Sequence, residues 1–223
     1  MEIVRAEKLE KIYQDNGVPV NALKGIDLAV SKGEYVVIAG PSGSGKTTLL
    51  NLLGALDKPT KGKIYFESED ITLKEKSELS KIRLHKLGFI FQAYNLIPVL
   101  TAIENIEFSM MLLGIPDKER KSKALALMDE LGIKELANKR PNEMSGGQQQ
   151  RVAVARAIVN NPSLVLADEP TANLDSKTAG HLLDLMEQMN TEKNITFIFS
   201  SHDKQVIDRA KRLVILKDGM IEK

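Results

Sequence analysis

The segment that most constrains the fold is a glycine-rich loop between an apolar run and a helical segment. It reads Gly40, Pro41, Ser42, Gly43, Ser44, Gly45, Lys46, Thr47, which fits the pattern G-x-x-x-x-G-K-[ST]. Residues 35–39 before it are apolar and rich in β-branched side chains, as in a strand buried on both faces of a parallel sheet. The loop's backbone N–H groups, the helix N-terminus and Lys46 together favour bound phosphates, so the segment predicts a nucleotide phosphate site.

Other interpretations of this loop fit less well. A dinucleotide-binding turn requires G-x-G-x-x-G, but the position after Gly43 and Gly45 where the third glycine belongs is Thr48. A merely flexible turn would leave unexplained the order of strand, loop, Lys-Thr and apolar helix. The hydroxyl of Thr47 can also serve as a ligand for Mg²⁺.

Composition excludes several classes of protein. The chain of 223 residues has 31 Lys and Arg against 30 Asp and Glu, a balance that argues against nucleic acid as the main partner. The absence of cysteine excludes a disulfide framework, a thiolate zinc site and a cysteine nucleophile. No apolar stretch approaches the ~18 residues needed to cross a bilayer, and the charged first residues do not fit a signal peptide. We expect a soluble, cytoplasmic protein.

The order of segments predicts an α/β fold. Residues 3–13 and 22–30 are expected to be strands of an antiparallel sheet with one solvated face, with Asn16 and Gly17 as a hairpin signal between them. Apolar runs at 164–167 and 195–199 resemble the run at 35–39, and residues 213–216 with the turn at 217–219 close the chain with a strand and hairpin. Ligands are then expected at the carboxyl ends of the parallel strands.

The middle of the chain has a helical pattern. Thr101 and Glu104 form a capping box for a helix that ends near Gly114, and Asp117 is expected to cap a second helix that stops at Gly132. A third helical stretch covers residues 151–159. We therefore predict one domain, with residues 1–93 and 159–223 as its core and residues 94–158 as a helical insertion.

Two adjacent carboxylates follow the apolar run at 164–167. Successive strand residues point to opposite sides, so Asp168 and Glu169 need not do the same work. Asp168 is predicted to orient a Mg²⁺-bound water, and Glu169 to face the attacking water as general base or polariser. A helix-capping role is the alternative, since Pro170 and Thr171 follow, but the phosphate loop upstream favours the catalytic interpretation.

A second candidate anion site precedes the third helical stretch. Ser145 is a good N-cap, and Gly146 and Gly147 leave backbone N–H groups open to an anion. One loop already accounts for the phosphates of one nucleotide. This second helix start is therefore expected to serve a nucleotide held by another copy of the chain.

With these motifs in this order, almost the whole sequence resembles the ATP-binding-cassette ATPases, the nucleotide-binding subunits of ABC transporters. The resemblance implies a P-loop NTPase core with an antiparallel β part and a helical insertion, and it implies ATP and Mg²⁺ as ligands. Tyr13 matches the aromatic residue that stacks on adenine, and the phosphate loop runs from Gly40 to Thr48. Gln92 matches the glutamine that contacts Mg²⁺ and the attacking water, Asp168 the magnesium-site aspartate, and Glu169 the catalytic glutamate. His202 matches the switch histidine, and Asp175 lies in the loop that communicates across the dimer. The signature motif is matched by Met144, Ser145, Gly146, Gly147 and Gln148.

Met144 stands where the family usually has Leu, a nearly volume-conserving exchange. Of the three histidines, His85 and His181 lie in polar helical contexts and are expected to be solvated, while His202 follows an apolar strand directly. Within the family the sequence looks most like the lipoprotein-releasing and macrolide-exporter branch. Cell-division ATPases of similar size are close relatives.

The resemblance implies a homodimer that closes on ATP, with a separate transmembrane permease as partner at the inner face of the cytoplasmic membrane. A mechanical regulator that bends a membrane partner and transports nothing is the alternative that the sequence leaves open. A repair or translation ATPase would need a long coiled coil or two cassettes, and a small-molecule kinase would leave residues 145–148 unexplained.

A stretch of apolar residues in the insertion is a candidate docking surface for the permease. The stretch consists of Ile103, Ile106, Phe108, Met110, Met111, Leu112 and Leu113. Met-rich surfaces adapt well to an inserted helix, so part of this stretch, with residues 94–100, is expected to receive a short permease helix. The alternative is that these side chains form the core of the insertion.

Overall fold

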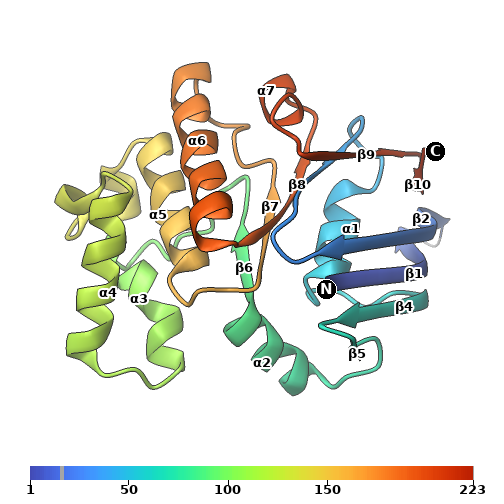
Figure 1. Cartoon of the computed structure of the whole chain (residues 1–223), viewed down its shortest axis with the longest axis horizontal. Coiled ribbons are helices and arrows are strands. Elements are labelled where there is room, and N and C mark those ends of the chain that lie inside the picture. Colours follow the sequence, from blue (N-terminus) through green and yellow to red (C-terminus); the bar gives the residue numbers. More distant parts are fainter. Residues whose placement is uncertain (16–17, 223) are drawn as a thin grey trace.

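The computed structural model describes residues 1–15 and 18–222, which form two β-sheets and a group of helices beyond the edge of the larger sheet (Figure 1). The larger sheet has six strands. In spatial order they are β10 (Met220–Ile221), β9 (Arg212–Lys217), β3 (Tyr35–Ala39), β8 (Thr196–Ser201), β7 (Leu164–Asp168) and β6 (Leu87–Ile90). All neighbouring pairs are parallel except β9 with β10, so the carboxyl ends of β3, β8, β7 and β6 meet at one edge.

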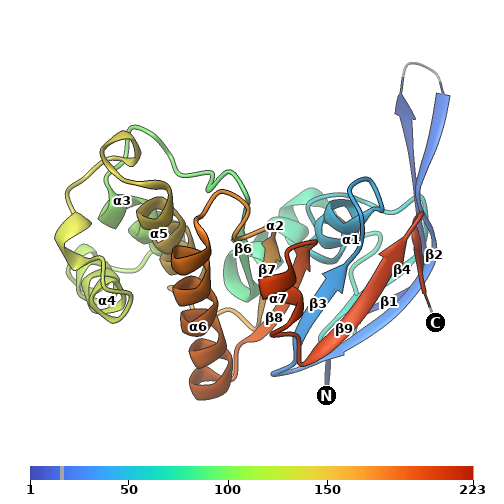
Figure 2. The same ribbon diagram turned by 90° about the horizontal axis from the view of Figure 1, so that it is seen from above.

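The central strands β3, β8 and β7 of this sheet are buried on both faces, as the apolar runs predicted. Alternate residues of β3 enter different cores: Tyr35 and Val37 pack with α5 and α6, whereas Val36 and Ile38 pack with α1 and the second sheet. Helices α1 and α2 lie on one side of the sheet and α6 and α7 on the other (Figure 2). These four helices are α1 (Lys46–Leu53), α2 (Lys76–Lys86), α6 (Ser176–Lys193) and α7 (Lys204–Ile207).

The smaller sheet is antiparallel and carries the predicted solvated face. Its order is β2 (Val18–Ser31), β1 (Glu2–Asp15), β4 (Lys61–Phe66) and β5 (Glu69–Asp70). Leu9, Ile26 and Ile64 face the core, while many intervening residues are exposed. The outer part of the β1–β2 hairpin extends away from the rest of the molecule (Figure 2). The hairpin signal at Asn16 and Gly17 lies outside the described residues.

Three helices of the insertion pack together on the β6 side of the large sheet (Figure 1). They are α3 (Ala102–Leu112), α4 (Asp117–Glu130) and α5 (Gly146–Ile158), with 3₁₀ turns at Lys134–Leu136 and Pro141–Glu143. The capping box of Thr101 and Glu104 is confirmed. The division of the chain at residues 94 and 158 stays a prediction.

Several predicted boundaries were wrong. Asp117 is not an N-cap: Pro116 holds that position, and Asp117 is the first helical residue and pairs with Lys121 one turn later. Helix α5 begins at Gly146, so the predicted cap at Ser145 is confirmed and the helix includes residues before the stretch 151–159. Strand β8 begins at Thr196, one residue later than predicted, because Asn194 ends α6 in the left-handed conformation.

No helix or strand was predicted from the sequence for residues 54–86. This segment forms β4, β5 and α2, and α2 exposes most of its surface, so its sequence has only a weak apolar stripe. Of the predicted strands, 3–13 and 22–30 are extended at both ends in the structure, and 164–167 gains Asp168. The closing strand and hairpin are confirmed as β9 and β10.

Gly88 in β6 allows the insertion to pack closely on the core. A Cβ at this position would lie 2.4 Å from the carbonyl oxygen of Ala157 in α5. Gly88→Ala is therefore expected to lower the free energy of unfolding by about 1–3 kcal/mol, measured by urea denaturation followed by circular dichroism. Gly180→Ala in α6 is the matched control, because a Cβ there meets only an Arg209 nitrogen, at 4.0 Å.

The control should raise the free energy of unfolding by about 0.4–1 kcal/mol, since alanine restricts the unfolded chain. Equal effects of the two substitutions would contradict close packing at Gly88.

Candidate functional site

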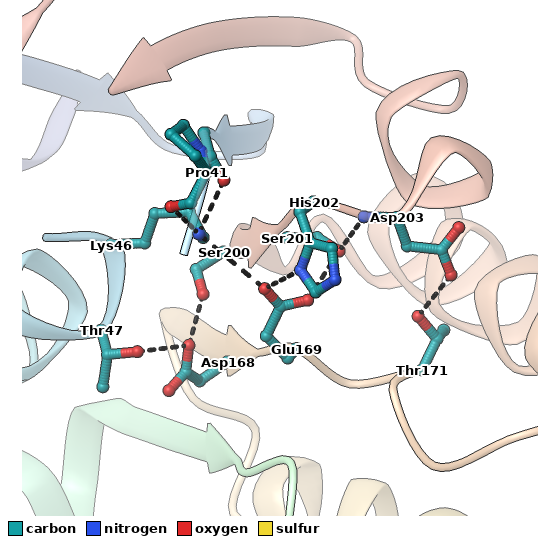
Figure 3. Close-up of polar contacts among 11 residues, drawn as sticks. Pro41, Lys46, Thr47, Asp168, Glu169, Thr171, Ser200, Ser201, His202 and Asp203 are labelled. Atoms are coloured by element: carbon teal, nitrogen blue, oxygen red, sulfur yellow. Dashed lines mark hydrogen bonds and ion pairs between the residues drawn. The ribbon is translucent and has the colours of Figure 1, made fainter. Parts of the chain in front are cut away.

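The parallel register brings the ends of three strands together. Ala39 at the end of β3 lies opposite Ser201 of β8, and Asp168 at the end of β7 lies opposite Ser200. The phosphate loop, the carboxylates and the segment with His202 therefore surround one place at the sheet edge (Figure 3). Their side chains reach this place because each lies at the end of a parallel strand or in the segment that follows one.

The phosphate loop turns sharply into α1. Gly45 precedes the helix with φ +103°, and Gly43 has φ +78°, both in the left-handed region that favours glycine. A Cβ at Gly40 would lie 2.0 Å from the carbonyl oxygen of Leu216, so this position also requires glycine. No side chain caps the N-terminus of α1, which leaves its backbone N–H groups directed at the loop. Such a turn binds anions.

Lys46 places its charge inside this loop. Its side chain is 7% exposed, and Nζ donates to the carbonyl oxygens of Gly40 at 2.8 Å and Pro41 at 3.0 Å. Oε1 of Glu169 lies 4.0 Å from Nζ. A triphosphate bound in the loop would replace these acceptors with charged oxygens, which are stronger partners for an ammonium group.

Asp168 and Glu169 have separate partners, as their alternation along the strand predicted. Asp168 Oδ1 accepts hydrogen bonds from Thr47 Oγ1 at 3.1 Å and from the hydroxyl of Ser200 (Figure 3). Glu169 Oε2 accepts from Ser201 Oγ at 3.0 Å, and its Oε1 lies 2.7 Å from Nδ1 of His202. Asp168 thus faces the start of α1, whereas Glu169 faces the loop after β8.

Glu169 has an unusual backbone. Its φ of +44° is uncommon for a residue other than glycine, and such conformations persist where the surroundings determine them. Its N–H donates to Ser200 at 2.9 Å, and its carbonyl accepts from Ala172 at 3.2 Å. Thr171, nearly fully buried, donates to Asp203 Oδ2 at 3.1 Å. The turn after β7 is therefore tied to the segment after β8.

Gln92 is exposed and lies just beyond β6. Its carbonyl oxygen accepts from Asn173 Nδ2 at 2.9 Å, but among the described residues no hydrogen bond joins its amide to Asp168 or Glu169. Tyr94 and Asn95 have positive φ, and Arg156 of α5 donates to both of their carbonyl oxygens. The loop after Gln92 is therefore held by α5.

Ser145 caps α5 as the sequence predicted. Its hydroxyl accepts from the N–H of Gln148 at 3.3 Å, and its own N–H donates to Gln148 Oε1 at 2.9 Å. A cavity of about 390 Å³ opens beside this helix start and includes Gly146, Gly147 and Asp175 in its lining. None of the described residues of the phosphate loop lines it. The two candidate anion sites are therefore separate within one chain.

Asp175 and Tyr13 have partners within the chain as well as predicted roles toward ATP. Asp175 caps α6, and its hydrogen bonds from Thr178 lower the pKa of its carboxyl group. Tyr13 donates to Asp57 Oδ2 at 2.9 Å, and burial and this hydrogen bond raise the pKa of the phenol. Tyr13 is 37% exposed, and Nζ of Lys11 lies 4.8 Å from the centroid of its ring.

Some residues of the site were not identified from the sequence. Ser200 and Ser201 hold the two carboxylates, and Asp57 holds Tyr13. Two hydroxyls at the end of an apolar strand were the available signal for Ser200 and Ser201. For Asp57 the sequence had no signal, since its contact with Tyr13 spans 44 positions.

The comparisons with known proteins agree with this geometry. Residues 23–172 match the model of the ABC transporter family. An uncharacterized ABC transporter ATP-binding protein of Thermotoga maritima is 48% identical, with 95% of this chain and 90% of that protein covered. The lipoprotein-releasing system ATP-binding protein LolD of Legionella pneumophila is 42% identical, with 98% and 96% covered.

A solved structure shares the fold over nearly its full length. It is the dimeric ATP-binding cassette of Methanocaldococcus jannaschii in a post-hydrolysis state with ADP and Pi, at a TM-score of 0.93 and 42% identity, covering 99% of this chain and 97% of that one. The chain belongs to the ABC transporter family, and it is an ATP-binding subunit and ATPase of that family. Within the family it belongs to the branch that holds LolD and the macrolide export protein MacB.

Lys46→Ala tests the phosphate loop. The change removes a charged donor from the loop, and a hydrogen bond to a charged group contributes about 1.5–3 kcal/mol, so ATP affinity should fall about 10- to 100-fold. Isothermal titration calorimetry measures the affinity. Lys81→Ala, at an exposed position on α2, is the control and should bind ATP like the unmodified chain. Unchanged affinity in Lys46→Ala would exclude this loop as the phosphate site.

Proposed function

We propose that two copies of this chain bind head to tail and enclose two ATP molecules between them. The phosphate loop of one copy would hold the triphosphate, and the Ser145 helix start of the other would complete the site. The supporting observation is that one chain has two helix N-termini suited to phosphate, at Gly45 and Ser145, which share no cavity among the described residues. A two-fold dimer pairs each loop with the partner's helix start and closes on itself.

In this proposal Glu169 is the general base. It would take a proton from the water that attacks the γ-phosphate, while Lys46 and the loop N–H groups hold the phosphate oxygens. His202, with a side chain two-thirds exposed, lies between Glu169 and solvent and would contact the γ-phosphate. Gln92 would contact the attacking water from the other side, where its loop is held by Arg156 and Asn173.

The donor set beside the phosphate loop fits Mg²⁺. Thr47 Oγ1 and Asp168 Oδ1 lie 3.1 Å apart and are both oxygens, which this ion prefers together with substrate phosphates and water. The described residues contain no cluster of three or more His, Cys, Asp or Glu that would form an all-protein metal site. Thr47 and Asp168, joined by Gln92, would hold the ion. When bound, it would neutralise charge on the phosphates.

ATP would act on the dimer through contacts that exist only when the dimer is closed. Ser145 and the first N–H groups of α5 would bind the γ-phosphate of the nucleotide held by the partner copy. Hydrolysis removes this differential affinity, so the equilibrium returns to the open state. Each cycle would thereby convert ATP hydrolysis into movement of the two subunits.

Among residues 1–15 and 18–222, no helix is both long and apolar enough to cross a membrane. Following the likeness to LolD, we place the subunit at the cytoplasmic face of a membrane, where it would drive a separate permease. A lipid-anchored substrate taken from the membrane, or an exported compound, would be selected by that permease. The likeness to LolD supports this role over that of a regulator that transports nothing.

The apolar stretch in α3 divides between core and surface. Ile106 and Met110 are fully buried, whereas Phe108, Met111 and Leu112 are 38%, 49% and 58% exposed. Phe108 and Met111 line a groove of about 490 Å³ along α3 and α4. In our proposal a short permease helix docks on these exposed side chains, and Ile106 and Met110 serve the core.

Glu169→Gln tests the catalytic assignment and the dimer together. The amide cannot accept the proton, so ATP turnover should fall at least about 100-fold, in line with general-base catalysis. ATP should then hold the dimer closed, with elution at the dimer volume in gel filtration. Adding Lys46→Ala in the same chain should restore the monomer. A strictly monomeric elution of Glu169→Gln with ATP would contradict the head-to-tail model.

Met111→Glu tests the docking surface. A charge in the apolar contact should weaken permease binding about 10- to 100-fold, as expected for a central contact, and abolish stimulation of the ATPase by the permease. Basal ATPase should not change, because Met111 lies away from the nucleotide. Leu73→Glu, at a position 88% exposed between β5 and α2, is the matched control. Full stimulation of Met111→Glu would exclude docking here.

A further inference from the structure

A buried glutamine connects α5 to the turn of residues 169–172 that follows β7. Gln150 of α5 is 0% exposed, and its Nε2 donates to the carbonyl oxygen of Pro170 at 2.8 Å. Pro170 directly follows Glu169 in the chain. The hydrogen bond joins residues 20 positions apart, across the boundary between the helices of the insertion and the large sheet.

The turn that Gln150 contacts has an unfavourable backbone conformation, so neighbouring elements must hold it in place. Glu169 has φ +44°, and the proline after it disfavours the right-handed helical conformation at that residue. Strand β8 holds the turn through Ser200, and the segment after β8 holds it through Asp203 with Thr171. Gln150 holds the turn from α5, at the Pro170 carbonyl. The hydrogen bonds of Glu169 and of its neighbour together fix where the carboxylate lies.

Stability alone does not explain an amide at this position. Gln150 Oε1 is buried and has no hydrogen-bond partner among the described residues, and a buried unpaired polar atom costs free energy. The Pro170 oxygen is an acceptor, so the amide must direct Nε2 toward it and leave Oε1 unpaired. An apolar side chain of equal volume would leave no such atom on α5. The hydrogen bond to the turn is therefore the one polar contact that the side chain of Gln150 makes among the described residues.

We propose that Gln150 is a positioning residue that fixes the Glu169 turn to the helix whose N-terminus would bind the partner's nucleotide. Ser145 and Gln150 lie five positions apart, on the first turns of one helix, so a displacement of the helix start moves the Pro170 anchor with it. Glu169 reaches its working position only when α5 is seated. The inference rests on the proposed role of Glu169 as general base.

Gln150→Met in the full-length chain tests the hydrogen bond. Methionine has a similar length and no donor, so Glu169 should lose its exact placement and kcat should fall about 10- to 100-fold, the effect of a displacement near 1 Å. KM for ATP should stay within about two-fold, because the phosphate loop is untouched. Thermal unfolding followed by circular dichroism verifies that the variant is folded.

Asn190→Leu is the matched control. Asn190 is a buried amide on α6 that donates to the carbonyl oxygens of Gly33 and Ile195, away from the catalytic turn. The control should lower the melting temperature but leave kcat per folded molecule unchanged. Equal losses of kcat in Gln150→Met and Asn190→Leu would show a structural role only and would overturn the proposal.

Gln150→Glu adds a second test, the pH dependence of kcat, which a purely structural role would not change. A neutral carboxylic acid can donate to the Pro170 oxygen, whereas a carboxylate cannot. Burial favours the neutral acid and raises the pKa of the new carboxyl group above the usual value of about 4.3. The ratio of its kcat to that of the unmodified chain should therefore be near one at about pH 6 and fall toward about pH 9.

The stability of the Gln150→Glu chain should also decrease as pH rises. With the folded-state pKa above the unfolded value, its stability is highest at low pH and decreases as pH rises through the folded pKa. Rates are therefore compared per folded molecule. A kcat ratio independent of pH, or a Gln150→Met chain with unchanged kcat, would refute the positioning role.

The two proposals can fail separately. If Glu169→Gln keeps its turnover, the general-base assignment fails and the positioning role fails with it. If Glu169→Gln loses turnover while Gln150→Met keeps the parental kcat, only the positioning role is refuted.

Discussion

The parallel pairing of β3, β8 and β7 is the constraint on which the rest of the structure depends. Parallel strands in register end at one edge, and each of these three is followed by residues that chemistry at a phosphate requires. Lys46 follows the first, Asp168 and Glu169 stand at the end of the third, and His202 follows the second. A shift of one residue in β7 would exchange the faces of Asp168 and Glu169 and separate both from their serine partners.

Two turns around this edge have strained backbone, as have several turns elsewhere in the described residues. Glu169, Tyr94 and Asn95 all have positive φ without being glycine, and each turn is held by a side chain of α5. Gln150 holds the turn after Glu169, and Arg156 holds the loop after Gln92. Helix α5 therefore donates hydrogen bonds to the turn after Glu169 and to the loop after Gln92. A conformation that costs free energy locally is maintained because neighbouring elements determine it.

The same helix carries the second candidate anion site on which the proposed dimer rests. Its N-terminus at Ser145 opens on a cavity that the described residues of the phosphate loop do not line. A helix start without an acidic residue in its first turn, and with two glycines, favours an anion from outside. In the proposed dimer the anion is the partner's nucleotide. One rigid helix would then bind the partner's nucleotide at its N-terminus and position Glu169 from its side.

Local patterns in the sequence were sufficient for the α/β class, the glycine-rich loop, the caps at Thr101 and Ser145, and the separate surroundings of Asp168 and Glu169. These features depend on neighbours in the chain: strand alternation, a glycine turn and a capping side chain each act within a few residues. Segment 54–86 was not predicted, because α2 is mostly exposed and β5 is two residues long.

The tertiary structure decided the contacts that join distant segments. Ser200 with Asp168, Arg156 with the loop after Gln92, and Gln150 with Pro170 are separated by 20 to 62 positions. A side chain such as Gln150 has the same sequence context whether it is solvated or buried against a catalytic turn. The sequence by itself therefore determined which groups the protein carries. Only the packing of α5 against the sheet decided where they are held, because long-range hydrogen bonds depend on geometry that no local pattern encodes.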